Sequence, residues 1–280
     1  MTDKKSALNK KIYEFVQSKP VWFCILYLFI FVVLGYKVFS VVVLKDTGLD
    51  NNWSTGFLKL SLSLLSIIFI KEIYSGNYSF NFKRKGLLQG LLLGWVAWLF
   101  LIFNLCVINY NGKLNWGLFF SVMVCNFFTG LFEEVTMRGI ILPHMIYKFD
   151  GEKNCIIKAV FWSSLMFGVL HLGNLIQGNY VATILQVFYA TAIGMIFSAI
   201  YLLTKSLWSV IIMHWLIDFA ASLEKAIINT AEQYTVNADG LFQFFLVIGL
   251  AIISFIVAIY FLRKKNRNKI CEMWAIKESE

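Results

Sequence analysis

The chain has 280 residues and is 59% hydrophobic, whereas soluble globular proteins contain about 45–50% apolar residues. Charged residues make up 15% of the chain, against roughly 25% in soluble proteins. This composition excludes an ordinary soluble protein and predicts an integral membrane protein. The formal net charge of +9 is compatible with nucleic-acid binding. Most basic residues lie between apolar runs, however, so we expect a lipid bilayer and no nucleic acid as partner.

Eight apolar runs are long enough to cross a bilayer, since about 20 helical residues span about 30 Å of hydrocarbon. The first run follows a polar, basic segment and is too long for the apolar part of a signal peptide, so we expect an uncleaved span. The second is the weakest, because Lys59 and the pair Lys71–Glu72 crowd its ends. The expected spans are residues 21–44, 57–74, 86–109, 116–142, 157–173, 181–203, 207–223 and 241–262. The sequence therefore predicts an all-α, polytopic membrane protein with about eight transmembrane helices.

The positions of the 25 Lys and Arg residues test this count. With eight spans and a cytoplasmic N-terminus, only Lys45, Lys113 and Lys225 fall in the opposite loops. A few lie within spans, and all the others fall on the cytoplasmic side, as the positive-inside rule requires. Both termini are therefore predicted to be cytoplasmic. Residue usage rich in Lys, Asn, Ile and Phe is typical of AT-rich bacterial genomes, so we expect a multi-pass protein of a bacterial plasma membrane.

The fourth span carries charges that apolar spans rarely contain. Glu133, Glu134 and Arg138 interrupt its apolar run, and each costs at least about 2.5 kcal/mol to insert. Glu134 and Arg138 are four residues apart, so they share one helix face and can form an ion pair. Glu133 points about 100° away and has no such local partner, which a purely structural ion pair leaves unexplained. Gly130, one turn earlier, would let another helix approach closely.

Two of the three histidines lie within other spans. His171 lies near the end of the fifth span, and His214 precedes Asp218 by four residues, which puts both side chains on one helix face. The distances to the nearest cytoplasmic lysine are about 22 Å for Glu133, about 20 Å for His171, about 14 Å for His214 and about 20 Å for Asp218. These depths are compatible, so we expect the four side chains to meet near mid-bilayer. The third histidine, His144, is predicted to lie at the cytoplasmic interface.

Such a set of groups suits hydrolysis. A carboxylate and a neutral imidazole that converge on one water form a general base, and the resulting oxyanion needs a donor such as an imidazole N–H. Glu133, His171 and His214 would also suit a catalytic zinc ion, so a metal-dependent mechanism stays open. A proton-coupled transporter is the general alternative for intramembrane carboxylates. It is often accompanied by internal repeats, and we find no convincing one.

Together these residues form three ordered motifs, each on its own span: Glu133-Glu134-x-x-x-Arg138, Phe167-x-x-x-His171 and His214-x-x-x-Asp218. They resemble the motifs of the CAAX protease and bacteriocin-processing family (CPBP, or Abi) of intramembrane endopeptidases. The resemblance covers a core at about residues 116–223. Residues 1–115 are then N-terminal transmembrane helices outside this core. Residues 224–280 form an extracytoplasmic loop, a last transmembrane helix and a basic cytoplasmic tail.

This resemblance implies an intramembrane endopeptidase acting on a peptide or a lipid-modified peptide. Glu133 and His171 would activate the water, Glu134 and Arg138 would order the site, and His214 with its partner would stabilise the oxyanion. A glutamate-based mechanism without a metal or other cofactor is our first choice, with zinc as the alternative. A non-catalytic immunity or regulatory protein with the same fold is the alternative function.

One position departs from the family pattern. Asp218 stands where the last motif often has Asn. An ionised carboxylate accepts hydrogen bonds but cannot donate one to an oxyanion. We therefore expect Asp218 either to be protonated or to orient His214 by accepting its N–H.

Overall fold

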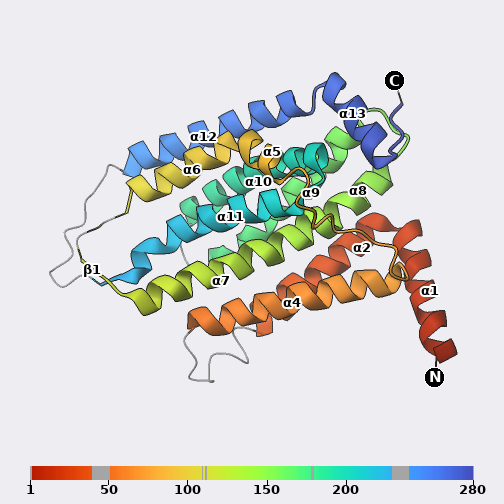
Figure 1. The fold of residues 1–280 in the computed structure, drawn as a ribbon, viewed down its shortest axis with the longest axis horizontal. Coiled ribbons are helices and arrows are strands. Elements are labelled where there is room, and N and C mark those ends of the chain that lie inside the picture. The colour runs from red at the N-terminus through yellow and green to blue at the C-terminus, as the bar shows by residue number, and fades with distance from the viewer. Residues whose placement is uncertain are drawn as a thin grey trace.

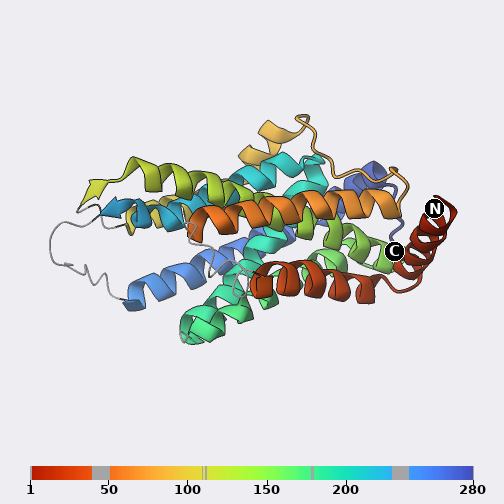
Figure 2. The same cartoon turned by 90° about the horizontal axis from the view of Figure 1, so that it is seen from below.

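The computed structural model describes residues 2–39, 51–108, 110, 112–177, 180–228 and 240–279. Long helices run roughly along the long axis of the molecule and pack into one bundle (Figure 1, Figure 2). Within these residues six helices are long and apolar enough to cross a membrane, or up to eight if each of two bent pairs is one span. The predicted all-α, polytopic membrane fold is therefore confirmed.

The helices follow the predicted spans closely. Their bounds in chain order are α1 (Thr2–Ser18), α2 (Pro20–Tyr27) with a π-helical continuation (Leu28–Val38), α4 (Asn51–Ile73), α5 (Leu87–Leu93), α6 (Trp95–Cys106), α7 (Trp116–Glu134) with a π-helical continuation (Val135–Ile141), α8 (Leu142–Phe149), α9 (Cys155–Leu170) with a 3₁₀ continuation (His171–Gln177), α10 (Tyr180–Thr204), α11 (Leu207–Ser222) with a 3₁₀ turn (Leu223–Ala226), α12 (Gly240–Phe261) and α13 (Lys264–Trp274). Strands β1 (Lys113–Leu114) and β2 (Ile227–Ile228) form a short antiparallel pair.

Two regions differ from straight, single spans. The predicted span 86–109 consists of α5 and α6, which meet at Gly94 with a bend of 65°. A Cβ atom on Gly94 would collide with the end of the Met213 side chain, so Met213 of α11 would have to move to admit a larger residue at the bend. At the N-terminus the basic segment forms α1, and the chain then turns by 113° before α2. Pro20 opens α2, since proline fits the first turn of a helix but cannot continue the preceding one.

The fourth predicted span is longer than expected and runs without a sharp break through 116–149. Asn115 caps its first turn, because its side-chain oxygen accepts a hydrogen bond from the Leu118 amide at 3.0 Å. The helix widens into π-helical turns at Val135–Ile141, directly after the paired glutamates. Such turns occur frequently at functional sites.

Two close contacts hold the core of the bundle together. Helix α10 packs against α9 and α12, and nearly all its residues from 190 to 204 are buried. Helix α7 packs between α4 and α11. A Cβ atom on Gly130 would lie 3.1 Å from the Trp215 backbone nitrogen, so the predicted close approach of another helix at this glycine is confirmed. Helices α7, α9 and α11, which carry the three motifs, are thereby gathered in the middle of the bundle.

The two ends of the bundle carry different secondary-structure elements. Helix α1, which opens the chain, and helix α13, which closes it, lie at the same end, and the β1–β2 pair lies at the other (Figure 1). This arrangement agrees with an even number of crossings, while the cytoplasmic position of the termini stays a prediction. Large apolar side chains such as Leu88, Ile184 and Ile256 are exposed on the outer faces, as lipid-facing helices require.

Candidate active site

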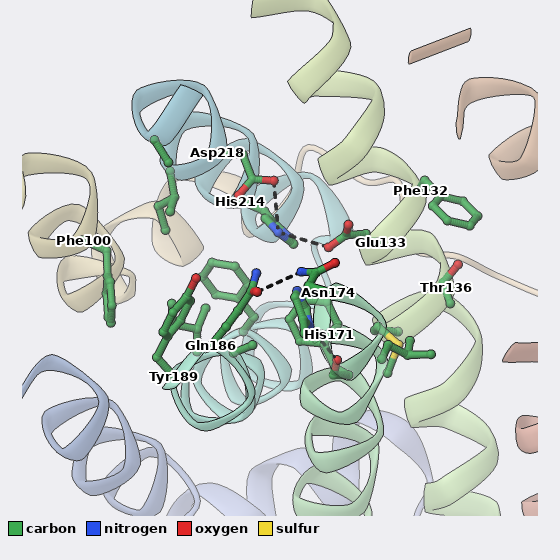
Figure 3. A pocket seen from close by; sticks show the side chains of 18 of the residues that line it. Phe100, Phe132, Glu133, Thr136, His171, Asn174, Gln186, Tyr189, His214 and Asp218 are labelled. Carbon is green, nitrogen blue, oxygen red and sulfur yellow. Dashed lines mark hydrogen bonds and ion pairs between the residues drawn. The ribbon is translucent and has the colours of Figure 1, made fainter. Parts of the chain in front are cut away.

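A cavity of about 400 Å³ lies among helices α4, α6, α7, α10 and α11 and the end of α9. This volume falls in the range of ligand-binding pockets. Its walls are largely apolar, with side chains such as Phe100, Phe132 and Phe197. The four residues expected to meet all line it: Glu133, His171, His214 and Asp218 (Figure 3).

His214 lies at the centre of three carboxyl groups. Its Nδ1 is 2.6 Å from Glu134 Oε1, and its Nε2 is 3.4 Å from Glu133 Oε2 and 3.6 Å from Asp218 Oδ2. Because an ionised carboxylate only accepts hydrogen bonds, the Nδ1–H of His214 donates to Glu134. Nε2 then faces the cavity-lining carboxyls. Helix α11 thus joins the third motif to the first through a single imidazole.

Behind the cavity, Glu134 and Arg138 form the predicted ion pair. Arg138 Nη1 donates to Glu134 Oε1 at 2.8 Å, and the two side chains are 1% and 0% exposed. Arg138 Nη2 donates to the Gly194 carbonyl oxygen at 2.9 Å. The guanidinium carbon also lies 5.3 Å and 5.5 Å from the ring centres of Phe167 and Phe197, within cation–π range. The pair is therefore placed to orient His214 rather than to meet a substrate.

His171 occupies the end of α9, where the helix tightens into its 3₁₀ continuation. Its Nδ1 is 3.0 Å from the Phe167 carbonyl oxygen, which can only accept. Nδ1 therefore carries a proton, and the neutral ring has its lone pair on Nε2. The Phe167 ring packs edge-on against the imidazole, with ring centres 5.0 Å apart, and fixes its plane. A neutral imidazole in this tautomer can take a proton from water.

Exposure separates the cluster into two layers. Glu133 and Asp218 are 25% and 29% exposed, whereas His214 is 10% exposed and Glu134 is fully buried. A molecule entering the cavity therefore meets Glu133 and Asp218 first. Glu133 has no partner within its own helix, and His214, from another helix, is its partner in the structure.

Several polar residues of the cavity wall, among them Asn174, Gln186 and Lys59, were not singled out as site residues from the sequence. Asn174 Nδ2 donates to Gln186 Oε1 at 2.9 Å, and Figure 3 shows this amide pair within the cavity. Lys59, from α4, also lines the cavity. The two amides give no signal in a sequence, because Asn and Gln occur in many structural roles. Lys59 was visible only as a charge in the second span.

The zinc alternative depends on how the possible metal ligands are arranged. No group of three or more His, Cys, Asp or Glu side chains within the described ranges is arranged to hold a metal ion. Glu133, His171 and His214 do not form such a group, although all three line the cavity. Metal dependence stays a prediction for experiment.

The third histidine is buried, and its place at the cytoplasmic interface stays a prediction. His144 is 3% exposed, with Nδ1 2.6 Å from the Ile140 carbonyl oxygen and Nε2 3.0 Å from the Tyr74 hydroxyl oxygen. Both ring nitrogens are therefore satisfied, one by the preceding π-helical turn and the other by Tyr74, which directly follows α4. His144 is not part of the cavity wall.

Comparison with known families tests the resemblance independently. Residues 115–220 match the sequence model of the family described as type II CAAX prenyl endopeptidase Rce1-like. No curated protein and no solved structure matches the chain. The matched segment begins at the cap of α7 and ends within α11, so it contains all three motifs. The predicted resemblance is confirmed: residues 115–220 of this multi-pass membrane protein match the sequence model of the Rce1-like type II CAAX prenyl endopeptidase family.

Proposed function

We propose that this protein is an intramembrane endopeptidase that hydrolyses a peptide bond in a peptide or lipid-modified peptide, using water activated by Glu133 and His171. One observation carries the proposal: Glu133, His171 and His214 come from three separate helices and line one apolar-walled cavity. The family match at residues 115–220 supports a CAAX-protease-like reaction.

In this mechanism the groups at the cavity surface activate the water. Glu133 and Nε2 of His171 are both able to accept a proton from a water molecule between them. The water oxygen attacks the peptide carbonyl carbon as its proton moves to Glu133 or His171. The tetrahedral intermediate then collapses, the C–N bond breaks, and the leaving amine receives the proton.

His214 and its neighbours stabilise the oxyanion. In its protonated form His214 donates from Nε2, and Glu134 holds the ring by accepting from Nδ1. Arg138 in turn fixes Glu134. The cluster contains three carboxyl groups but only one guanidinium within ion-pair distance, so burial favours an additional proton. His214 and Asp218 share that proton. The shared proton supplies a hydrogen-bond donor at position 218, where the family pattern often has the side-chain amide of Asn.

Replacing Asp218 tests this arrangement. Asp218→Asn is expected to keep activity, because its amide donates to the oxyanion without needing a shared proton. Asp218→Ala is expected to lower kcat by about 10²–10³-fold, the cost of removing one oxyanion donor. The measurement is kcat and KM on a reporter peptide with purified protein in lipid. Equal inactivity of the two variants would show that the carboxylate itself is needed and would reject the donor role.

Chelation tests the metal-free choice. After treatment with a chelator, the purified protein is expected to keep its full rate of peptide cleavage, and elemental analysis is expected to find no stoichiometric zinc. Loss of activity that added zinc restores would contradict the glutamate mechanism.

The reaction itself is tested with purified full-length protein in lipid vesicles and peptides with and without a lipid modification. Mass spectrometry of the products is expected to locate one cleaved bond. In ¹⁸O-labelled water, the new carboxyl group is expected to carry one solvent oxygen. Peptides that bind but stay intact would favour the non-catalytic, regulatory alternative.

A further inference from the structure

A second cavity lies at the end of the bundle where α1 and α13 are found, between α1 and the end of α4 (Figure 1). We call it the terminal cleft. It is lined by Asn9, Lys10 and Tyr13 of α1 and by residues 71–77, which comprise the last turn of α4 and the turn that follows it. Its volume is about 720 Å³, and none of these residues lines the active-site cavity. The terminal cleft is therefore a separate site.

Two ammonium groups from different helices line the terminal cleft. Lys10 comes from α1 and Lys71 from the last turn of α4, and both side chains are exposed. Among the described residues, no carboxylate lies within ion-pair distance of either lysine. Glu72 is the one carboxyl group among the described residues of the wall, so the wall has a net positive charge. An anion is therefore the complementary ligand.

Ordinary structural roles explain only one of the two lysines. A cation in the last turn of a helix interacts favourably with the helix dipole, which accounts for Lys71. This effect does not reach Lys10, which lies within α1. The packing of α1 against α4 comes from neighbouring side chains. The Tyr13 ring lies edge-on against Tyr74, with ring centres 5.4 Å apart, and Gln17 Nε2 donates to the Tyr74 hydroxyl oxygen at 3.4 Å.

The orientation of α1 places the terminal cleft at the membrane surface. The chain turns by 113° between α1 and α2, so α1 runs almost at right angles to the bundle (Figure 1). With the helices of the bundle crossing the bilayer, α1 lies close to the plane of the membrane surface. Leu8 and Tyr13 are exposed on α1, as are Lys10 and Lys11. Apolar and basic side chains on one exposed helix are typical of helices that lie among lipid headgroups.

We propose that the terminal cleft binds the phosphodiester headgroup of an anionic phospholipid, with Lys10 and Lys71 as its cationic ligands. Each ammonium has three N–H donors, and the ionised phosphodiester oxygens accept them in charge-assisted hydrogen bonds. Leu8, which directly precedes Asn9 of the cleft wall, offers an apolar neighbour to the acyl chains. A free phosphate has no group that would use it. This site lies outside the active-site cavity, so the inference does not depend on the proposed function.

Lipid binding to the purified full-length protein tests the site. The probes are phosphatidylglycerol and phosphatidylcholine with the same acyl chains, added to delipidated protein in a neutral detergent. Bound lipid is measured by native mass spectrometry. Phosphatidylglycerol is expected to bind about 10–30-fold more tightly, because each lysine near a headgroup contributes about a 5-fold gain in affinity for an anionic lipid. The preference is expected to decrease as the salt concentration rises.

Substitutions assign the preference to the terminal cleft. Lys10→Met and Lys71→Met are each expected to reduce the preference about 5-fold. The double variant is expected to abolish it and to leave the affinity for phosphatidylcholine unchanged. Lys11→Met is the matched control, because Lys11 is the next residue of α1, is also exposed and lies outside the cleft wall. This variant is expected to keep the full preference, and all variants are expected to keep the wild-type thermal unfolding midpoint.

Equal affinity for the two lipids would overturn the inference. A loss in Lys11→Met as large as that in Lys10→Met would show a general attraction of the basic helix to anionic lipid and would overturn the cleft site as well. Inorganic phosphate is then added to protein with bound phosphatidylglycerol, with chloride at the same ionic strength as the reference. The lipid is expected to stay bound to the same extent in both salts. Its selective displacement by phosphate would assign the cleft to a free phosphate and reject the lipid.

Discussion

Glu133→Gln is expected to lower kcat by about 10²–10⁴-fold while the protein still accumulates and folds in the membrane. Glutamine keeps the size and shape of the side chain, but its amide cannot take a proton from water. Glu133 is the part-exposed carboxyl of the first motif, and its oxygen is 3.4 Å from His214 Nε2. Loss of the charge therefore removes the base while the surrounding packing stays in place.

Glu152→Gln provides the matched control. Glu152 forms ion pairs with Lys148 and Lys158 in half-exposed positions and lies outside the cavity wall. The same chemical change there is expected to leave kcat unchanged. Full activity of purified Glu133→Gln would reject Glu133 as the base and with it the proposed mechanism.

Arg138→Met is expected to lower the free energy of unfolding by about 3–5 kcal/mol, the usual result of breaking a buried ion pair on one side. Methionine fills part of the space between the Phe167 and Phe197 rings but has no donors. Glu134 keeps a buried negative charge with His214 as its remaining partner, and the Gly194 carbonyl oxygen loses its hydrogen bond. The measurement is the thermal unfolding midpoint of purified protein in detergent.

Two further variants show that the effect comes from the charge left behind. Lys158→Met breaks an ion pair whose members are 41% and 42% exposed, so only a small loss of stability is expected. The double variant Arg138→Met/Glu134→Gln removes both charges and is expected to recover part of the lost stability without recovering activity. Wild-type stability in Arg138→Met alone would contradict this account of the ion pair.

Local geometry made much of the molecule predictable. In a bilayer every backbone polar group must be satisfied within the segment, so an apolar run of sufficient length can hardly be anything but a helix. The spacing of Glu134 and Arg138 is likewise a property of one helix, and the 2.8 Å ion pair follows from it. The depths of Glu133, His171 and His214 depend only on the rise per residue, and all three reach one cavity.

Contacts between helices were decided by the tertiary structure alone. No spacing in the sequence links His214 to Glu134, yet the close approach of α7 and α11 at Gly130 brings Nδ1 within 2.6 Å of that carboxylate. At the bend, Gly94 lies against the Met213 side chain of another helix.

The sequence by itself therefore predicts a membrane-spanning helical protein and a set of polar residues at compatible depths, because both follow from geometry within single helices. Only the tertiary structure shows which nitrogen of His214 faces which carboxyl group. It alone also shows that Lys59 and Asn174 line the same cavity. These relations depend on distances of a few ångströms between separate helices. Such distances are set by the packing of whole side-chain surfaces, which no local spacing encodes.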